Sequence, residues 1–140
     1  MKVSGGSNFP YVSAPDFPKG HSTNALFEFV DIYPALSELS GLPVPHHIKG
    51  DSFVPLMNNP GQFWKKAAFS QYPRSQNRMG YTMKTDQYRY TEWATRDSNC
   101  EILARELYDR ATDPAENIKV VEAPVYQTIE PDLAAMMQAG

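Results

Sequence analysis

Apolar residues recur at helical spacing shortly after residue 31, and the residues around them mark both ends of a helix. The side chains that recur at intervals of three and form one apolar stripe are Tyr33, Leu36 and Leu39. Asp31 is expected to be the N-cap, because its carboxylate can accept a free backbone N–H of the first turn. Pro34 then falls at the third helical position, where its missing N–H has no helical partner to lose. Gly41 is expected to end the helix in the left-handed conformation, and Pro43 prevents its continuation.

Alternation with period two dominates the second half of the chain. The runs that predict strands span residues 66–72, 79–85, 88–93 and 105–108. Pro73 is expected to end the first run, and residues 74–78 have the composition of a polar turn. Only Asp86 and Gln87 separate the second and third runs, which predicts a two-residue hairpin.

The alternation also assigns side chains to faces. One face of the third run carries Tyr88, Tyr90 and Glu92, and the other carries Arg89, Thr91 and Trp93. A sheet with an open face needs cover, and the last segment can provide it. Its apolar residues have helical spacing, with Pro131 in the first turn, and are Ile129, Leu133, Met136 and Met137. The predicted fold class is α+β, a small antiparallel sheet of about four strands packed with a C-terminal helix.

Proline and glycine dominate the remaining segments. Residues 1–24 contain only one β-prone stretch, at 9–14, which predicts a short strand. Four prolines and two glycines punctuate residues 43–62, which predicts a loop.

Composition narrows the function classes. The net charge is −3 and no basic run is longer than the pair Lys65–Lys66, which argues against nucleic-acid binding. No apolar stretch reaches the length of about 18 residues that a membrane span needs. Residues 1–6 lack the apolar run of a signal peptide, so the sequence indicates no compartment. The single cysteine, Cys100, cannot close a disulfide within the chain and is expected to be a buried or partly buried thiol.

Several short motifs follow one another in a fixed order. They are EFVDIYP at 28–34, SQYPR at 70–74, MGY at 79–81, YRYTEW at 88–93 and ELYD at 106–109. Together they resemble the C-terminal portion of type I sulfatases, in the iduronate-2-sulfatase-like branch of the alkaline phosphatase-like superfamily. The resemblance covers about residues 9 to 137. It implies that residues 1–62 are the tail end of the large α/β domain, with a strand, a helix and a proline-rich crossover. Residues 63–140 would then be the C-terminal subdomain.

The resemblance also implies a chemistry that these residues do not contain. Sulfatases use a formylglycine made from the cysteine of a Cys-x-Pro-x-Arg motif, together with a divalent metal that is usually calcium. Ile102 and Ala104 stand where that motif, read from Cys100, needs proline and arginine. The acidic residues are scattered and include no Asp-Asp pair. We therefore expect no catalytic residue, metal ligand or cofactor here, and a sulfuric-ester hydrolase fragment that is inactive alone. Full-length members are usually periplasmic, secreted or lysosomal.

Four residues around the turn at 73–80 are candidates for binding substrate. They are Tyr72, Arg74, Arg78 and Tyr81. The resemblance implies that this subdomain walls the substrate cleft, and a guanidinium fork suits the sulfate and carboxylate groups of glycosaminoglycans. The alternative is a solvated turn with its aromatic residues in the core of the sheet.

The N-terminal segment is expected to need a partner. Without a large central sheet, six apolar residues would lack cover: Phe9, Tyr11, Leu26, Phe29, Val30 and Ile32. The partner is either a missing N-terminal sulfatase domain or a second copy of the chain in a homodimer. Two other functions stay open, namely a stand-alone module that binds anionic sugars or oligomerises, and an unrelated enzyme whose site forms only in space.

Overall fold

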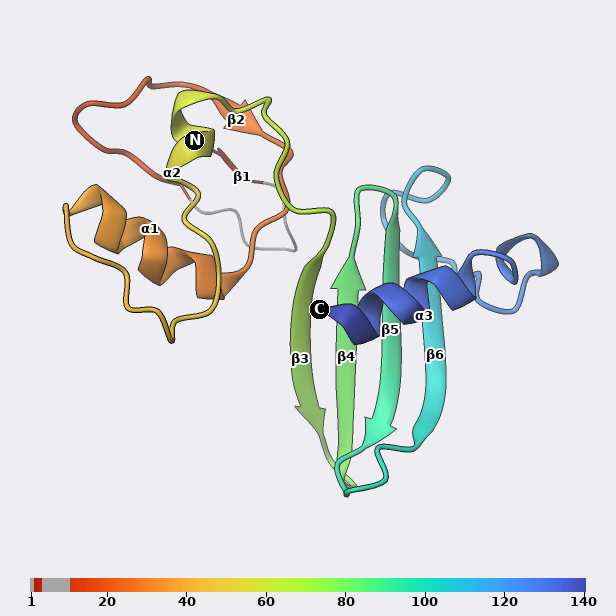
Figure 1. Ribbon diagram of the computed structural model, residues 1–140. Helices are drawn as coiled ribbons and strands as arrows, with labels where there is room; N and C mark the ends of the chain where they lie inside the picture. Colours follow the sequence, from red (N-terminus) through yellow and green to blue (C-terminus); the bar gives the residue numbers. More distant parts are fainter. Residues whose placement is uncertain (1, 4–10) are drawn as a thin grey trace. The chain divides into compact units, whose positions relative to one another are not determined.

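The chain folds into two compact units, Met1–Ala68 and Phe69–Gly140. The computed structural model describes residues 2–3 and 11–140. Figure 1 shows short helices and loops in the first unit, and a sheet with one long helix in the second.

The first unit contains little regular structure. Strand β1 (Lys2–Val3) pairs in parallel with β2 (Ser22–Thr23). A 3-10 turn, η1 (Phe29–Asp31), leads into α1 (Ile32–Leu39). The predicted strand at 9–14 is not formed over 12–14, Tyr11 makes only a single bridge, and residues 9 and 10 lie outside the described residues.

A second helix corrects the prediction of a loop over residues 43–62. Helix α2 (Val54–Asn58) occupies the middle of that segment. Pro55 lies in its first turn, where the N–H that proline lacks would have no partner within the helix. The density of prolines therefore concealed a helix that has one of them in its first turn.

Asp31 precedes α1 as predicted, but its carboxylate does not cap the first turn of that helix. One carboxylate oxygen accepts the Glu28 N–H at 2.9 Å, which completes a reciprocal capping box around η1. The other accepts the Asp51 N–H at 2.9 Å and the Lys65 ammonium at 2.6 Å. The side chain is 0% exposed, so this carboxylate joins three separate segments of the unit instead of serving one helix end.

The C-terminal end of α1 is as predicted. Gly41 has a φ of 67°, and its N–H donates to the Glu38 carbonyl at 3.0 Å. The Leu42 N–H donates to the Ser37 carbonyl at 2.9 Å, which completes a Schellman motif.

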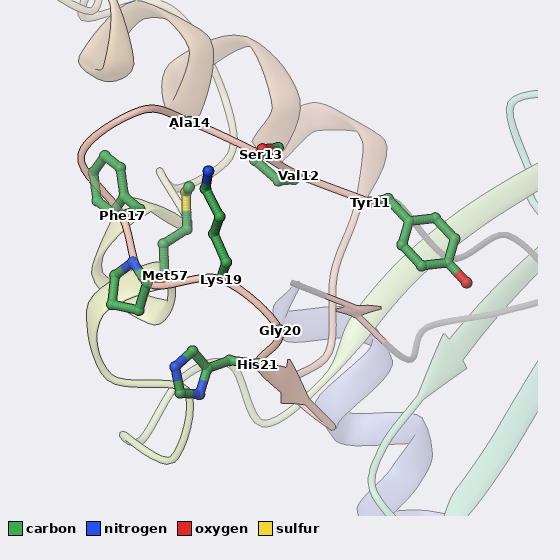
Figure 2. A pocket seen from close by; sticks show the side chains of 10 residues that line it. Tyr11, Val12, Ser13, Ala14, Phe17, Lys19, Gly20, His21 and Met57 are labelled. Atoms are coloured by element: carbon green, nitrogen blue, oxygen red, sulfur yellow. The ribbon is translucent and has the colours of Figure 1, made fainter.

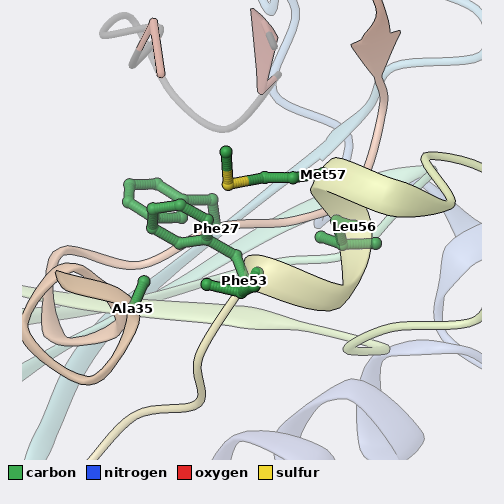
Figure 3. Close-up of a cluster of buried hydrophobic side chains, with 6 residues drawn as sticks. Phe27, Ala35, Phe53, Leu56 and Met57 are labelled. Carbon is green, nitrogen blue, oxygen red and sulfur yellow. The ribbon is translucent and has the colours of Figure 1, made fainter. Parts of the chain in front are cut away.

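The apolar stripe of α1 does not face the core as a whole. Tyr33 and Leu36 are more than half exposed, whereas Ala35 is fully buried and Leu39 packs partly against the core. The core of the first unit is formed by Phe27, Ala35, Phe53, Val54, Leu56 and Met57. The rings of Phe27 and Phe53 meet edge to face at 5.4 Å, with Met57 beside them (Figure 3).

The second unit is a four-stranded meander in the order β3-β4-β5-β6, as the sequence predicted. The strands are β3 (Ala68–Arg74), β4 (Arg78–Lys84), β5 (Tyr88–Thr95) and β6 (Ile102–Asp109). A 3-10 turn, η2 (Pro124–Tyr126), precedes α3 (Glu130–Ala139), whose N-cap is Ile129.

Every strand boundary except the start of β5 differs from the prediction by one to three residues, and two of the differences have a clear physical cause. Pro73 lies inside β3 and does not end it, because β3 is an edge strand and proline needs no ladder donor on an outer edge. Strand β6 begins at Ile102 instead of residue 105, and a register shift opposite Trp93 and Ala94 accommodates the additional residues. A bulge of this kind disturbs the alternation from which the start of the strand was predicted.

Helix α3 lies across one face of the sheet (Figure 1) and buries the core of this unit. The buried core residues of this unit are Met83, Tyr90, Ala94 and Leu107 from the sheet and Leu133 from α3. The predicted faces of β5 are confirmed, since the Tyr90 hydroxyl lies 2.8 Å from Glu92 and 2.9 Å from Glu130 of α3. Arg105 contacts both carboxylates, so a polar network joins the start of α3 to the sheet. Among the described helices, none is both long enough and apolar enough to cross a bilayer.

Candidate functional site

The turn between β3 and β4 places two arginines at its ends. Residues 75–77 connect β3 to β4, and two of them, Gln76 and Asn77, have positive φ, at 62° and 57°. Because the connection is this short, Arg74 at the end of β3 and Arg78 at the start of β4 are held close together on neighbouring strands. Glutamine rarely adopts positive φ, and such strain is typical of functional sites.

Trp93 lies on the face of the sheet away from α3, which we call the open face. Its partner in the register is Gly80, and a Cβ added there would meet the indole ring at 2.7 Å. The ring therefore lies against the backbone of β4, and its Nε1–H donates to Glu106 at 3.1 Å. The Arg74 guanidinium stacks on the Tyr72 ring, 4.7 Å from its centroid, and lies 5.6 Å from the centroid of Trp93.

These residues line a cavity of about 610 Å³. The residues that line it are Arg74, Ser75, Gln76, Arg78, Trp93, Leu103 and Ala104. The turn contributes a basic and polar wall, and β6 contributes an apolar wall. No acidic residue is among them, so the cavity suits an anionic ligand with an apolar side.

The arginines of the cavity differ in their electrostatic partners from the three arginines further along the sheet. Arg89, Arg105 and Arg110 each form an ion pair with a glutamate. Within residues 2–3 and 11–140, no ion pair involves Arg74 or Arg78. Their charge is therefore available to a ligand.

A second basic group lies further along the open face, where its surroundings differ. Burial lowers the pKa of Lys84, and the neighbouring positive charge of Arg110 lowers it further, although Glu116 opposes both effects. The Arg89 guanidinium stacks on the Tyr108 ring, 4.5 Å from its centroid, and pairs with Glu116. Glu116 also pairs with Arg110, so two of the three cations at this end of the face already have a carboxylate partner, whereas neither arginine of the cavity has one in the described part of the chain.

The structure places three of the four predicted site residues together. Tyr72, Arg74 and Arg78 lie at the open-face end of the β3–β4 hairpin, whereas Tyr81 pairs in register with Glu92 and shares the face that α3 covers. Trp93, Leu103 and Ala104 also line the cavity but were not among the predicted site residues. Alternation in β5 gave the face of Trp93, but nothing in the sequence showed that Gly80 lies opposite it.

A smaller cavity of about 270 Å³ occurs in the first unit (Figure 2). Phe17 and Met57 give it an apolar side, and Lys19 extends from its rim towards the segment of Ser13 and Ala14. The Lys19 and His21 side chains are exposed. Nothing in this cavity orients a buried polar group, so it has weaker features of a binding site than the cavity at Trp93.

The described residues do not fit the cofactors that the family implies. They contain no group of three or more His, Cys, Asp or Glu side chains that could hold a metal ion. Cys100 is exposed and not buried as predicted, because it lies in the β5–β6 connection with a φ of 45°. No step through calcium or formylglycine is therefore assigned to these residues.

The fold and the site define the small α+β domain that ends a sulfatase. The chain belongs to the family of N-sulphoglucosamine sulphohydrolase C-terminal domains, whose model matches residues 10–139. It is 31% identical over 106 residues to a sulfatase of Formosa agariphila, covering 76% of this chain and 19% of that protein. It is 28% identical to the iduronate 2-sulfatase of Mus musculus, covering 86% of this chain and 30% of that protein. The chain thus spans less than a third of these relatives.

A solved structure shares the fold. BT4656, in complex with its substrate D-glucosamine-2-N,6-O-disulfate, superposes with a TM-score of 0.64 at 23% identity. The match covers 78% of this chain and 22% of that one.

Replacing Gly80 by alanine is expected to lower the free energy of unfolding by about 1–3 kcal/mol, which is the range for overpacking. The new methyl group would meet the Trp93 ring at 2.7 Å and force it away from its hydrogen bond with Glu106. Denaturant titration measures the change. Gly61→Ala is the control, because the nearest atom to its methyl group lies at 3.9 Å. Equal effects of the two substitutions would contradict the close packing of Trp93.

Proposed function

We propose that this chain is the C-terminal part of an iduronate-2-sulfatase-like hydrolase of sulfuric esters, and that it acts together with an α/β catalytic domain. The family match over residues 10–139 carries the proposal, because the two relatives named above are about four times as long as this chain. In this assignment residues 1–62 end the large domain and residues 63–140 form the C-terminal subdomain.

Exposed apolar side chains support a covering domain. Phe29 is 73% exposed and Tyr33 52%, and Leu36 and Leu42 are also more than half exposed. Of the six residues expected to lack cover, Leu26 is buried and Ile32 packs partly on the core, but Tyr11, Phe29 and Val30 are exposed. Phe9 lies outside the described residues. Exposed apolar residues that gather on one short segment, as Phe29, Val30, Tyr33 and Leu36 do, are typical of a surface that another domain or chain covers.

The residues present indicate what each part would supply to the active site. The catalytic domain would supply the formylglycine and the calcium site, since these 140 residues contain no Cys-x-Pro-x-Arg sequence. This chain would supply Arg74 and Arg78, with Tyr72 beside them, to the wall of the substrate cleft. Their unpaired positive charge favours a sulfated sugar as the substrate. Tyr81 would contribute through the packing of β4 against the helix face.

Self-association is the second candidate, and the same exposed residues of α1 favour it. Two copies that bury Phe29, Tyr33 and Leu36 against each other would form a homodimer without any catalytic domain. Sedimentation of the isolated chain distinguishes the two candidates. Self-association predicts a dimer, whereas the first proposal requires a catalytic domain to cover these residues.

Joining this chain to the catalytic part of mouse iduronate 2-sulfatase, in place of that enzyme's own C-terminal part, tests the proposal. We expect the chimera to release sulfate from a 2-sulfated iduronoside, whereas neither the catalytic part nor this chain alone does so. A chimera without its formylglycine cysteine is the inactive control. A chimera that is secreted and folded, but no more active than the catalytic part alone, would contradict the proposal.

A further inference from the structure

We propose that the cavity at Trp93 is a binding subsite for a sulfated pyranose, in which the indole supports the sugar ring and Arg74 and Arg78 hold its sulfate group. The inference rests on the proposed function and extends it. It assigns a binding role to Trp93, and it gives the arginines a ligand of defined chemistry.

The indole ring is held in place before any ligand binds. One of its faces lies against the backbone at Gly80, where no Cβ intervenes. Its Nε1–H donates to Glu106, whose other oxygen lies 3.4 Å from the Tyr108 hydroxyl. Rotation of the ring would break the first of these bonds. A ring that does not have to be ordered on binding costs a ligand little conformational entropy.

Charge and shape distinguish a sulfated sugar from a simple anion. The cavity carries two arginines and no carboxylate, and a guanidinium can give a sulfate two parallel hydrogen bonds. A simple anion would use only this side. Leu103 and Ala104 form the opposite wall, which suits the C–H face of a sugar ring. The volume, about 610 Å³, lies within the range of small-molecule sites.

The intact chain, labelled with ¹⁵N, can report binding directly. Its two tryptophans, Trp64 and Trp93, give two indole N–H signals, and Trp64 belongs to the first unit. We expect D-glucosamine-2-N,6-O-disulfate to shift the Trp93 signal and leave the Trp64 signal in place. Its Kd should be at least about tenfold lower than those of N-acetylglucosamine and inorganic sulfate, because each lacks one half of the interaction.

Variants separate the two halves of the subsite. Arg78→Ala, at an exposed position, is expected to raise the Kd for the disulfate about tenfold or more. Trp93→Phe should raise the Kd for the disulfate and for N-acetylglucosamine but leave the Kd for inorganic sulfate unchanged. Arg96→Ala is the matched control, because Arg96 is an exposed arginine that does not line the cavity. It should leave the Kd unchanged.

Three results would overturn the subsite: a disulfate that binds no more tightly than inorganic sulfate, an unmoved Trp93 signal, or equal losses in Arg78→Ala and Arg96→Ala. The chimera tests the proposed function separately. An active chimera with an unresponsive Trp93 leaves the proposed function standing without the subsite, and an inactive chimera with a responsive Trp93 does the reverse.

Discussion

Replacing Lys65 by methionine is expected to lower the free energy of unfolding by about 3–5 kcal/mol, the usual cost of removing one partner from a buried ion pair. The Lys65 ammonium lies 2.6 Å from Asp31 and 2.6 Å from Glu28. Methionine keeps most of the volume, but it leaves the fully buried Asp31 carboxylate without a counter-charge. Chemical denaturation followed by circular dichroism measures the loss.

The neighbouring lysine provides the control. Lys66 is exposed, so Lys66→Met should change stability by no more than about 0.5 kcal/mol. The double variant Asp31→Asn/Lys65→Met should regain part of the loss, because the fully buried position 31 then carries no charge. A Lys65→Met protein as stable as Lys66→Met would show that the cluster does not hold the unit together.

The same cluster sets a pH dependence. Burial on its own lowers the pKa of Lys65, but hydrogen bonds to Asp31 and Glu28 outweigh it and raise that pKa above its ordinary value. A raised pKa means that the stabilisation is complete below the unfolded value, about 10.4, and disappears as the pH rises through the folded value. The difference between wild type and Lys65→Met should therefore persist up to pH 10 and shrink only above it.

Asp31 shows how far local sequence rules reach. The sequence correctly placed this residue at the start of α1, because capping preferences act over three or four residues. Its main partners, Asp51 and Lys65, follow 20 and 34 residues later. No spacing rule connects residues so far apart, so the burial of the carboxylate became visible only in the fold.

Proline gave the least reliable signals, because its effect depends on position. Pro34 and Pro131 were predicted correctly, since both fall in a first helical turn that the surrounding apolar spacing had already indicated. Pro55 also lies in a first turn, but α2 has only five residues and too few apolar repeats to reveal it. Pro73 was taken to end a strand, and only the strand order shows that it lies on an edge.

The candidate site was predictable in part for the same reason. Arg74 and Arg78 flank a turn, so their proximity follows from local sequence. The place of Trp93 beside them depends on the register of β4 against β5, which puts Gly80 opposite the indole. A one-residue shift would have moved every side chain of β5 to the other face. Tyr81 is close to Arg78 in sequence, yet the alternation of β4 separates their faces.

Replacing Asp109 by alanine is expected to lower the free energy of unfolding by about 2–4 kcal/mol, because it leaves buried donors without an acceptor. Asp109 is 5% exposed and ends β6. One oxygen accepts the Ala111 N–H at 2.9 Å and the Gln87 amide at 3.1 Å, and the other accepts the Tyr126 hydroxyl at 2.9 Å. The carboxylate thus fixes the β4–β5 hairpin and the segment before α3 to the end of β6.

Acid is expected to weaken the junction at Asp109 by protonating its carboxylate. Burial alone would raise the pKa of Asp109, but hydrogen bonds from the Ala111 N–H, Tyr126 and Gln87 lower it below its ordinary value. A depressed pKa contributes stability above the unfolded value, about 3.9, and that contribution is lost as the pH falls through the folded value. Asp109→Asn should therefore lose less stability than wild type between pH 5 and pH 2, as thermal unfolding at each pH can measure.

Asp113 is expected to contribute to the acid dependence of stability that remains in Asp109→Asn. The backbone N–H of Ile118 lowers the pKa of Asp113 as well, so part of the acid sensitivity belongs to the next turn. Asp86→Ala is the control for both substitutions, because Asp86 is exposed in the hairpin that Gln87 shares. Its stability should stay within about 0.5 kcal/mol of wild type. If Asp109→Asn followed the wild-type acid profile at every pH, protonation of Asp109 would not contribute to the acid sensitivity of the sheet unit, and the prediction would be wrong.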